Sequence, residues 1–362
     1  MNFWHELKKK RGKDPIICLA PMADVTDRAF RRMIVKYGKY TRPHSKIVGG
    51  PDVMWTEFVS ADGLFLGGYD ALINDLSFTK KERPIVAQFF TSKPEMIEKA
   101  ARLAVELGFD GIDINMGCPD RSIEKQNAGA KLITNPKLAQ EIIYSAKRGA
   151  GKSPRQPLGE IPVSVKTRVG WSKNELETWL PVLLETNPAV ITIHARTRKE
   201  LSLVPARWEH IKRAVEIRDG FIDSKGNKSK TLIIGNGDVR DLDDAKAKAK
   251  ETGCDGVMIG RAFFGTPWLL NPRASLGQKE QYISTQKRLK ILLEHAKLFE
   301  KLCHSKPPTG QGKNFAIMKK HYKAYVTGWD GAKELRRRLM ETKNAKEVEK
   351  IINNYLIHVK SL

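Results

Sequence analysis

The sequence predicts an α/β protein in which a (β/α)8 barrel is followed by a small all-helical C-terminal domain. Short apolar segments alternate with amphipathic ones about eight times before residue 270, and a parallel sheet needs a helical crossover after every strand. From Gln278 onward the strand-like segments stop and only helical patterns remain. We therefore expect a catalytic barrel over residues 1–275 and a helical domain over residues 276–362.

Most of the expected barrel strands are compact apolar runs that end at a polar residue or a glycine. These strands are Ile16–Ala20, a less regular one near Ile47, Pro84–Gln88, Gly111–Asn115, Pro162–Lys166, Val190–His194, Leu232–Asn236 and Gly256–Gly260. The expected helices between them are Arg28–Tyr37, Pro94–Leu107, one beginning near Pro136, Glu175–Glu185, Arg207–Ile217, Leu242–Glu251 and Arg261–Leu270. The expected C-terminal helices are Tyr282–Cys303, Phe315–Thr327, Ala332–Glu341 and Lys346–His358. Two stretches read as surface insertions, namely Gly149–Glu160 and Asp219–Lys230.

The chain is strongly basic, with 64 Lys and Arg against 41 Asp and Glu and a net charge of +23. Residues 278–362 alone hold 19 basic and 8 acidic residues, so the helical part carries +11 of that excess. A sign bias across a whole domain favours contact with a polyanion, whereas a single cluster is usually a solvated helix face. No apolar run reaches the roughly 20 residues of a membrane span, so we expect a cytoplasmic protein without membrane contact. The four cysteines form no Cys-x-x-Cys pair, which argues against a bound metal.

The most informative stretch is Gly111–Pro119, where a short strand runs into Asn115, Gly117 and Cys118. Gly117 and Pro119 end the strand, so the Cys118 thiol is expected at its carboxyl end, where parallel barrels carry their chemistry. A thiol with an ordinary pKa of about 8.5 is mostly protonated at neutral pH and can act as an acid. Burial as a small hydrophobic residue is the alternative for any free cysteine.

Polar residues follow nearly every expected strand. Polar residues at the ends of seven strands are difficult to explain by structural roles alone. The last two, Asn236–Asp238 and Gly260-Arg261, fit phosphate binding, which barrels often place after strands 7 and 8. Lys166 and His194 could hold the electron-rich part of a flavin ring, because a cation stabilises the negative charge of its reduced form. The predicted cofactor is FMN.

Six segments together carry a family resemblance. They are Leu19–Ala23 with Thr26-Asp27, Asp113–Pro119 with Gly129–Leu132, Val165–Arg168, Ile193–Thr197, Asn236–Asp238 and Ile259–Ala262. In these segments the chain resembles the tRNA-dihydrouridine synthases, over about residues 16–270. The likeness extends more weakly to the C-terminal helices through Met318–His321 and Gly331–Arg336.

The resemblance implies an FMN, reduced by NADPH, that passes hydride to C6 of a uracil base in tRNA while Cys118 protonates C5. It implies that FMN is held by Pro21, Met22, Ala23, Gln88, Lys166, His194, Asn236, Gly237, Asp238, Gly260 and Arg261. It places the substrate against Asn115, Arg168, Arg196, Lys319, Lys320, His321 and Arg336. The base would leave the tRNA stack while the basic helices grip phosphates. We expect a monomer, because no sequence feature signals a dimer.

Two other functions compete with this interpretation. One is an FMN barrel that reduces free pyrimidines, against which the charge of the helical domain argues, since a free base needs no phosphate grip. The other is a non-catalytic RNA-binding barrel, which would have no need for Cys118, Lys166 and His194. The sequence leaves open which uridine is reduced.

Overall fold

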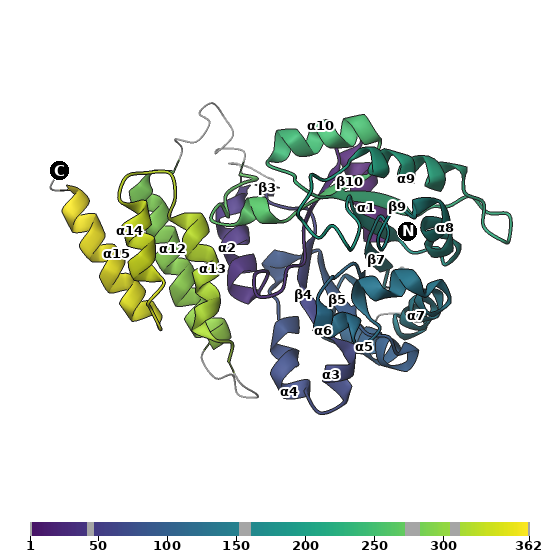
Figure 1. Cartoon of the computed structure of the whole chain (residues 1–362), viewed down its shortest axis with the longest axis horizontal. Coiled ribbons are helices and arrows are strands. Elements are labelled where there is room, and N and C mark those ends of the chain that lie inside the picture. Colours follow the sequence, from purple (N-terminus) through teal and green to yellow (C-terminus); the bar gives the residue numbers. More distant parts are fainter. Residues whose placement is uncertain (1, 42–46, 152–160, 272–282, 305–311, 361–362) are drawn as a thin grey trace.

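The computed structural model describes residues 2–41, 47–151, 161–271, 283–304 and 312–360. Eight parallel strands form its main sheet, in the order β1-β10-β9-β8-β7-β6-β5-β4 (Figure 1). They are β1 (Ile16–Leu19), β4 (Met54–Ser60), β5 (Ile85–Phe90), β6 (Gly111–Met116), β7 (Val163–Arg168), β8 (Val190–His194), β9 (Leu232–Asn236) and β10 (Gly256–Ile259). The two edges of the sheet meet, because Cys18 pairs with Val53 in a parallel bridge and Leu19 N–H donates to Val53 O at 3.0 Å. The predicted barrel is confirmed.

Helices surround this barrel, and several of them begin where the sequence supplies a start signal. Asp27 caps α2 by accepting from Phe30 N–H, and proline occupies the first turn of α5 and α7, where its missing N–H costs nothing. The longer helices of the ring are α2 (Arg28–Gly38), α5 (Pro94–Leu107), α7 (Pro136–Gly149), α8 (Leu176–Glu185), α9 (Glu209–Gly220) and α10 (Leu242–Thr252). Shorter ones are α3 (Ala61–Phe65), α4 (Tyr69–Leu72), α6 (Arg121–Glu124) and the 3-10 helices η1 (Ile73–Leu76), η2 (Lys80–Glu82) and η3 (Gly129–Thr134).

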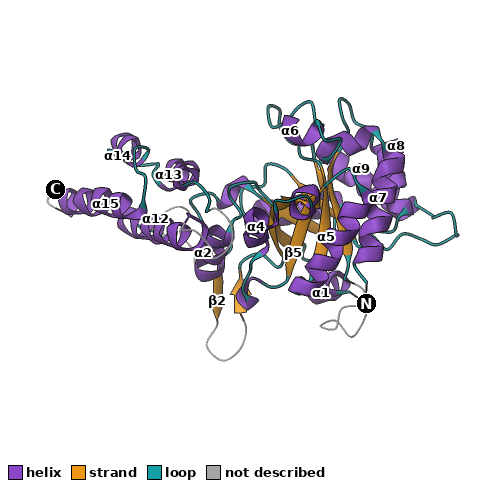
Figure 2. Ribbon diagram, turned by 90° about the horizontal axis from the view of Figure 1, so that it is seen from below, coloured by secondary structure: helices purple, strands orange, loops and turns teal. Residues whose placement is uncertain are grey.

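The barrel has a closed end and an open end. Helix α1 (Phe3–Arg11) lies across the end where the strands begin, and α6 lies at the opposite end (Figure 2). Trp4 of α1 is fully buried against Trp55, with ring centroids 5.7 Å apart. The amino ends of the strands are therefore sealed by apolar packing, which leaves their carboxyl ends for chemistry.

The strand predicted near Ile47 forms, but its assignment to the barrel is wrong. Ile47–Gly49 is β3, which pairs in antiparallel fashion with β2 (Lys39–Thr41), and the barrel strand in this region is β4. The helix predicted over Arg261–Leu270 is also wrong. Only the 3-10 helix η4 (Arg261–Phe263) forms, because Gly265 takes a positive φ of 68° and Pro267 follows it.

The C-terminal helices form a lobe beside α2 (Figure 1). They are α12 (Thr285–Phe299), a π-helical turn η5 (Glu300–His304), η6 (Phe315–Ile317), α13 (Met318–Tyr325), α14 (Ala332–Leu339) and α15 (Ala345–Lys360). Ala29 and Met33 of α2 share one buried apolar cluster with this lobe, separate from the main barrel core. The helical lobe is thus seated on the barrel through α2.

Two further observations concern the outside of the barrel. The insertion predicted at Asp219–Lys230 forms a turn closed by an isolated bridge between Ile222 and Lys228, whereas most of the one at Gly149–Glu160 lies outside the described residues. None of the helices in the described ranges combines the length and apolar character that a membrane span requires.

Candidate active site

A pocket of about 270 Å³ lies at the carboxyl ends of β1 and β7–β10. Parallel strands bring their carboxyl ends to one rim, so residues distant in sequence meet there. Nine residues predicted to hold the cofactor line this pocket: Pro21, Met22, Lys166, His194, Asn236, Gly237, Asp238, Gly260 and Arg261. The other lining residues are Ala20, Arg196, Ser202, Val239 and Met258.

Lys166 supplies a cation from β7 at the floor of the pocket. Its Nζ lies 3.2 Å from Asn236 Oδ1, and Asn236 Nδ2 donates to Met258 O at 2.8 Å, which turns the amide oxygen toward the lysine. Burial lowers the pKa of Lys166 to about 8, helped by the nearby Arg168 charge and opposed by Asp113. At neutral pH the side chain is still mostly protonated.

His194 at the end of β8 is neutral, and its contacts fix which nitrogen carries the proton. Arg196 Nη1 lies 3.0 Å from His194 Nε2. A guanidinium can only donate, so Nε2 must accept and the ring proton must be on Nδ1. Burial, together with the charges of Lys166, Arg168, Arg196 and Arg261, holds the pKa of His194 well below its usual value.

We expect Arg196→Met to remove the preference of His194 for the Nδ1–H tautomer. A hydrogen bond from a charged donor is worth about 1.5–3 kcal/mol, so in the unmodified chain the Nδ1–H form should dominate by about tenfold or more. Nitrogen-15 NMR of histidine-labelled protein at pH 7 measures the ratio, with His194→Gln to assign the signal. Arg240→Met, which removes an exposed arginine that pairs with Asp244, is the control. An Nε2–H signal for His194 in the unmodified protein would contradict the assignment.

Two glycines keep the pocket open. A Cβ on Gly237, whose φ is 129°, would lie 2.7 Å from Ala206 Cβ and 3.2 Å from His194 Cδ2. A Cβ on Gly260 would lie 3.4 Å from both Ala20 Cβ and Met22 Sδ. Because neither position carries a side chain, a ligand can approach the backbone of both loops.

Cys118 follows β6 in a loop that is tied down on both sides. Asn115 Oδ1 accepts from the N–H groups of Gly117 at 3.1 Å and Cys118 at 2.9 Å, while Cys118 O accepts from Ala130 N–H at 2.9 Å. The thiol is half-buried. Burial raises its pKa, which Lys166 and Arg168 lower only in part, so the thiol is protonated at neutral pH.

A buried polar chain supports Asn115 from below. Gln88 Oε1 accepts from Asn115 Nδ2 at 3.3 Å, and Gln88 Nε2 donates to Asp113 Oδ2 at 2.6 Å. Ser164 Oγ donates to the other carboxylate oxygen of Asp113 at 2.6 Å. Burial raises the pKa of Asp113 to about 6. These hydrogen-bonded side chains fix the amide of Asn115, and the amide in turn fixes the position of Cys118.

Comparison with known proteins decides the family. The profile described as Dihydrouridine synthase matches residues 18–360. The chain is 35% identical over 356 residues to "Probable tRNA-dihydrouridine synthase 2" of Bacillus subtilis (strain 168), covering 98% of this chain and 96% of that protein. It is 35% identical over 357 residues to "Probable tRNA-dihydrouridine synthase" of Staphylococcus aureus (strain COL), covering 98% and 95%. This chain belongs to the dihydrouridine synthase family.

Membership confirms the expected enzyme class, and this chain is a flavin-dependent oxidoreductase. Among solved structures it is similar to histamine dehydrogenase from Rhizobium sp. 4-9, with a TM-score of 0.50 and 11% identity. That alignment covers 95% of this chain and 62% of the other, and it bears on the fold alone. Within the described residues, no group of three or more His, Cys, Asp or Glu side chains is arranged to hold a metal ion.

Several predicted site residues of this family member lie elsewhere than expected. Arg168, predicted to face the substrate, donates to the carbonyls of Gly117 at 2.8 Å and of Thr197 and Leu201 at 3.0 Å. It therefore joins the loop before Cys118 to the loop after β8. Arg196, also assigned to the substrate, lies instead in the wall of the pocket described above, where it donates to Asp238. Gln88 and Ala23 are not among the residues that line that pocket.

Of the predicted tRNA contacts on the C-terminal helices, some are accessible to solvent and one is buried. Lys320 is exposed and Lys319 and Arg336 are half-buried, with Arg336 Nη1 donating to Val326 O at 2.6 Å. His321 is wrong as a surface contact, because its side chain is fully buried. It lies on the inward face of α13 with Met318, Tyr322 and Tyr325, at helical spacing that the flanking lysines obscure.

Sequence reasoning missed a cluster around Trp171, which follows β7. Lys131 Nζ lies 5.0 Å from its ring centroid and the guanidinium carbon of Arg198 lies 5.1 Å from it. Arg198 pairs with Glu124 of α6. Trp171 lies three residues beyond Arg168, just after a predicted strand. That position is the sequence signal that could have identified it as a residue near the site.

Proposed function

We propose that this enzyme reduces the C5–C6 bond of uridines in tRNA to dihydrouridine, with FMN as cofactor and NADPH as reductant. The observation that carries the proposal is the Cys118 thiol, held protonated at a strand end near a cationic pocket. When bound, FMN supplies the hydride for one carbon of the base. The protein must then supply a proton for the other carbon.

The pocket suits a flavin mononucleotide. Its lining holds Lys166, Arg196 and Arg261 against one carboxylate, Asp238. Arg196 and Arg261 both pair with Asp238, so the carboxylate fixes the two guanidinium groups and leaves an excess of positive charge. That excess favours a phosphate near the two glycine-containing loops and an electron-rich ring at Lys166. The volume of about 270 Å³ is near the lower limit of roughly 300 Å³ for small-molecule sites, and the pocket is open to solvent.

Cys118 is proposed as the general acid. Burial of the thiol raises its pKa, so it carries a proton to give, and Asn115 fixes its backbone. Arg168 holds the same loop through Gly117 O. These residues orient the acid, while the pocket wall orients the cofactor.

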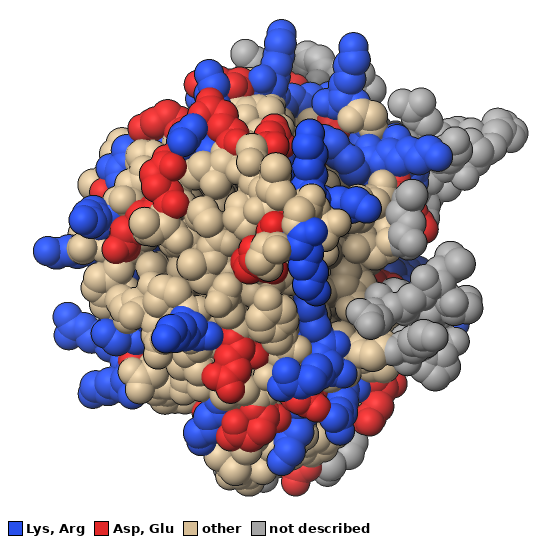
Figure 3. All heavy atoms as spheres, turned by 90° about the vertical axis from the view of Figure 1, so that its right-hand side faces the viewer, with Lys and Arg blue, Asp and Glu red and all other residues tan. Residues whose placement is uncertain are grey.

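The C-terminal helices are proposed to hold the phosphates of tRNA. Their segment carries +11, and Arg337 and Arg338 are exposed on α14. On the barrel face remote from these helices, basic and acidic side chains interleave around a broad uncharged area (Figure 3). A phosphate grip on one side would leave the barrel mouth to accept a base flipped out of the stack.

The product tests this function directly. Purified enzyme with FMN and NADPH should convert uridine to dihydrouridine in tRNA that lacks the modification, as measured by mass spectrometry of the nucleosides. Conversion of free uracil with no conversion in tRNA would favour a pyrimidine reductase instead.

A further inference from the structure

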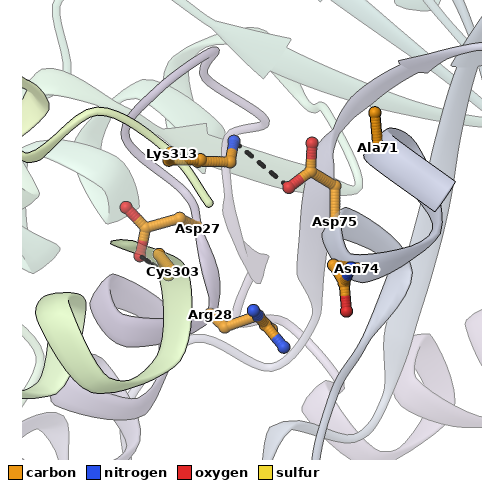
Figure 4. A pocket seen from close by; sticks show the side chains of 7 residues that line it. All are labelled: Asp27, Arg28, Ala71, Asn74, Asp75, Cys303 and Lys313. Atoms are coloured by element: carbon orange, nitrogen blue, oxygen red, sulfur yellow. Dashed lines mark hydrogen bonds and ion pairs between the residues drawn. The ribbon is translucent and has the colours of Figure 1, made fainter. Parts of the chain in front are cut away.

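Lys313 belongs to the C-terminal part of the chain, but its ammonium group lies against the barrel. Its Nζ is 2.7 Å from Glu57 Oε2 on β4 and 3.2 Å from Asp75 Oδ1 on η1. The contact joins residues 256 positions apart. Figure 4 shows Lys313 directed toward Asp75, beside a small pocket that Asp27 and Cys303 also line.

The other oxygen of Glu57 bonds to the loop that follows β1. Glu57 Oε1 accepts from Asp24 N–H at 2.6 Å. Asp24 lies in the loop that joins β1 to α2, and Pro21 and Met22 of this loop line the cofactor pocket. Asp24 has a φ of 52°, in the left-handed region that a non-glycine residue keeps only when its surroundings hold it there. One buried carboxylate therefore links Lys313 to the loop.

The charge balance at Glu57 depends on Lys313. Asp75 and Asp27 also face this carboxyl, and burial raises the pKa of Glu57 to about 7 even with the ammonium group in place. The ammonium opposes the shift, so without it the pKa of Glu57 would rise further and more of the carboxyl would be protonated at neutral pH. Glu57 would then lose the charge that strengthens its bond to Asp24 N–H.

Neighbouring contacts seat the same segment. Arg28 donates to Leu302 O, and Cys303 Sγ lies 3.8 Å from Asp27 Oδ1. The pocket between these side chains measures only about 20 Å³, enough for about one water molecule. The start of α2, directly after the cofactor loop, is thus closely packed against the C-terminal lobe.

We propose that Lys313 is a positioning residue that couples docking of the C-terminal helices to the shape of the cofactor loop 21–24. It does so through its contact with Glu57 Oε2, since the other oxygen of the same carboxyl accepts from Asp24 N–H. The proposal rests on the proposed FMN site, and by reciprocity cofactor binding should strengthen docking of the helical lobe.

Hydrogen exchange in the full-length chain without cofactor tests the loop directly. Lys313→Met should speed exchange of the Asp24 amide by about tenfold or more, while Lys313→Arg, which restores a cation, should return it to near the unmodified rate. Lys36→Met is the matched control, because Lys36 and Glu294 form an exposed ion pair across the same boundary. Unchanged exchange in Lys313→Met would overturn the proposal.

FMN affinity, measured by quenching of flavin fluorescence, is the second readout. Lys313→Met should weaken binding at least tenfold, Lys313→Arg should restore most of it, and Lys36→Met should have no effect. Glu57→Gln should weaken binding too, and adding it to Lys313→Met should cost little more, since both act through one contact. Unchanged affinity in both single variants would refute the coupling. Faster Asp24 exchange in a protein that binds no FMN would instead refute the cofactor while supporting the link to the loop.

Discussion

Replacement of Cys118 by alanine should slow reduction of the tRNA base by about 10²-fold or more, the scale of a lost general acid. Binding of FMN and tRNA should change little, because the backbone N–H of residue 118 still bonds to Asn115 Oδ1. Single-turnover assays of the reduced enzyme with tRNA measure the loss.

Cys254→Ala is the control for this variant. Cys254 is buried near the start of β10, where its thiol donates to Gly256 O at 3.2 Å, and it does not line the cofactor pocket. The control should keep the unmodified rate. Equal rates for Cys118→Ala and the control would remove Cys118 from the mechanism.

Lys166→Met should slow reduction of the bound cofactor by about 10²–10³-fold, as expected when one preorganised charge is lost from the transition state. The variant also frees Asn236 Oδ1, which loses its donor at 3.2 Å. Stopped-flow mixing with NADPH measures the rate. Lys8→Met, at an ion pair with Asp255 at the closed end of the barrel, should behave like the unmodified enzyme.

The pH dependence of the reduction rate shows whether the charge of Lys166 or the shape of its side chain matters. Burial lowers the pKa of Lys166 to about 8, so the lysine loses its proton as pH rises through that value, and the rate should fall with it. Lys166→Arg stays protonated in this range and should flatten the curve between about pH 7 and pH 9. An unchanged alkaline fall in Lys166→Arg would show that another group titrates.

Much of the barrel could be predicted because its strands are short apolar runs that helical segments separate. The exception is β4, where Thr56 and Glu57 are buried. Glu57 is tolerated there because Lys313 pairs with it from a distant part of the chain. Local patterns do not contain that information, and the sequence alone points to the segment near Ile47 instead.

The positions of the site residues could be predicted from the sequence, but the directions of their side chains could not. Parallel strands bring their carboxyl ends together, which placed Lys166, His194 and Asn236 around one pocket. The direction of each side chain depends on its hydrogen-bond partners, which the strand pattern does not show. Arg168 and Arg196 follow strands as predicted, but their guanidinium groups turn to backbone carbonyls and to Asp238.

The central claim is that an FMN in this pocket carries hydride from NADPH to a base in tRNA. Anaerobic absorption spectra of the full-length protein test it most directly. We expect flavin bands that bleach when NADPH is added and return only when tRNA lacking dihydrouridine follows. A colourless protein that takes up no added FMN, or a bleached flavin that such tRNA fails to reoxidise, would contradict the account.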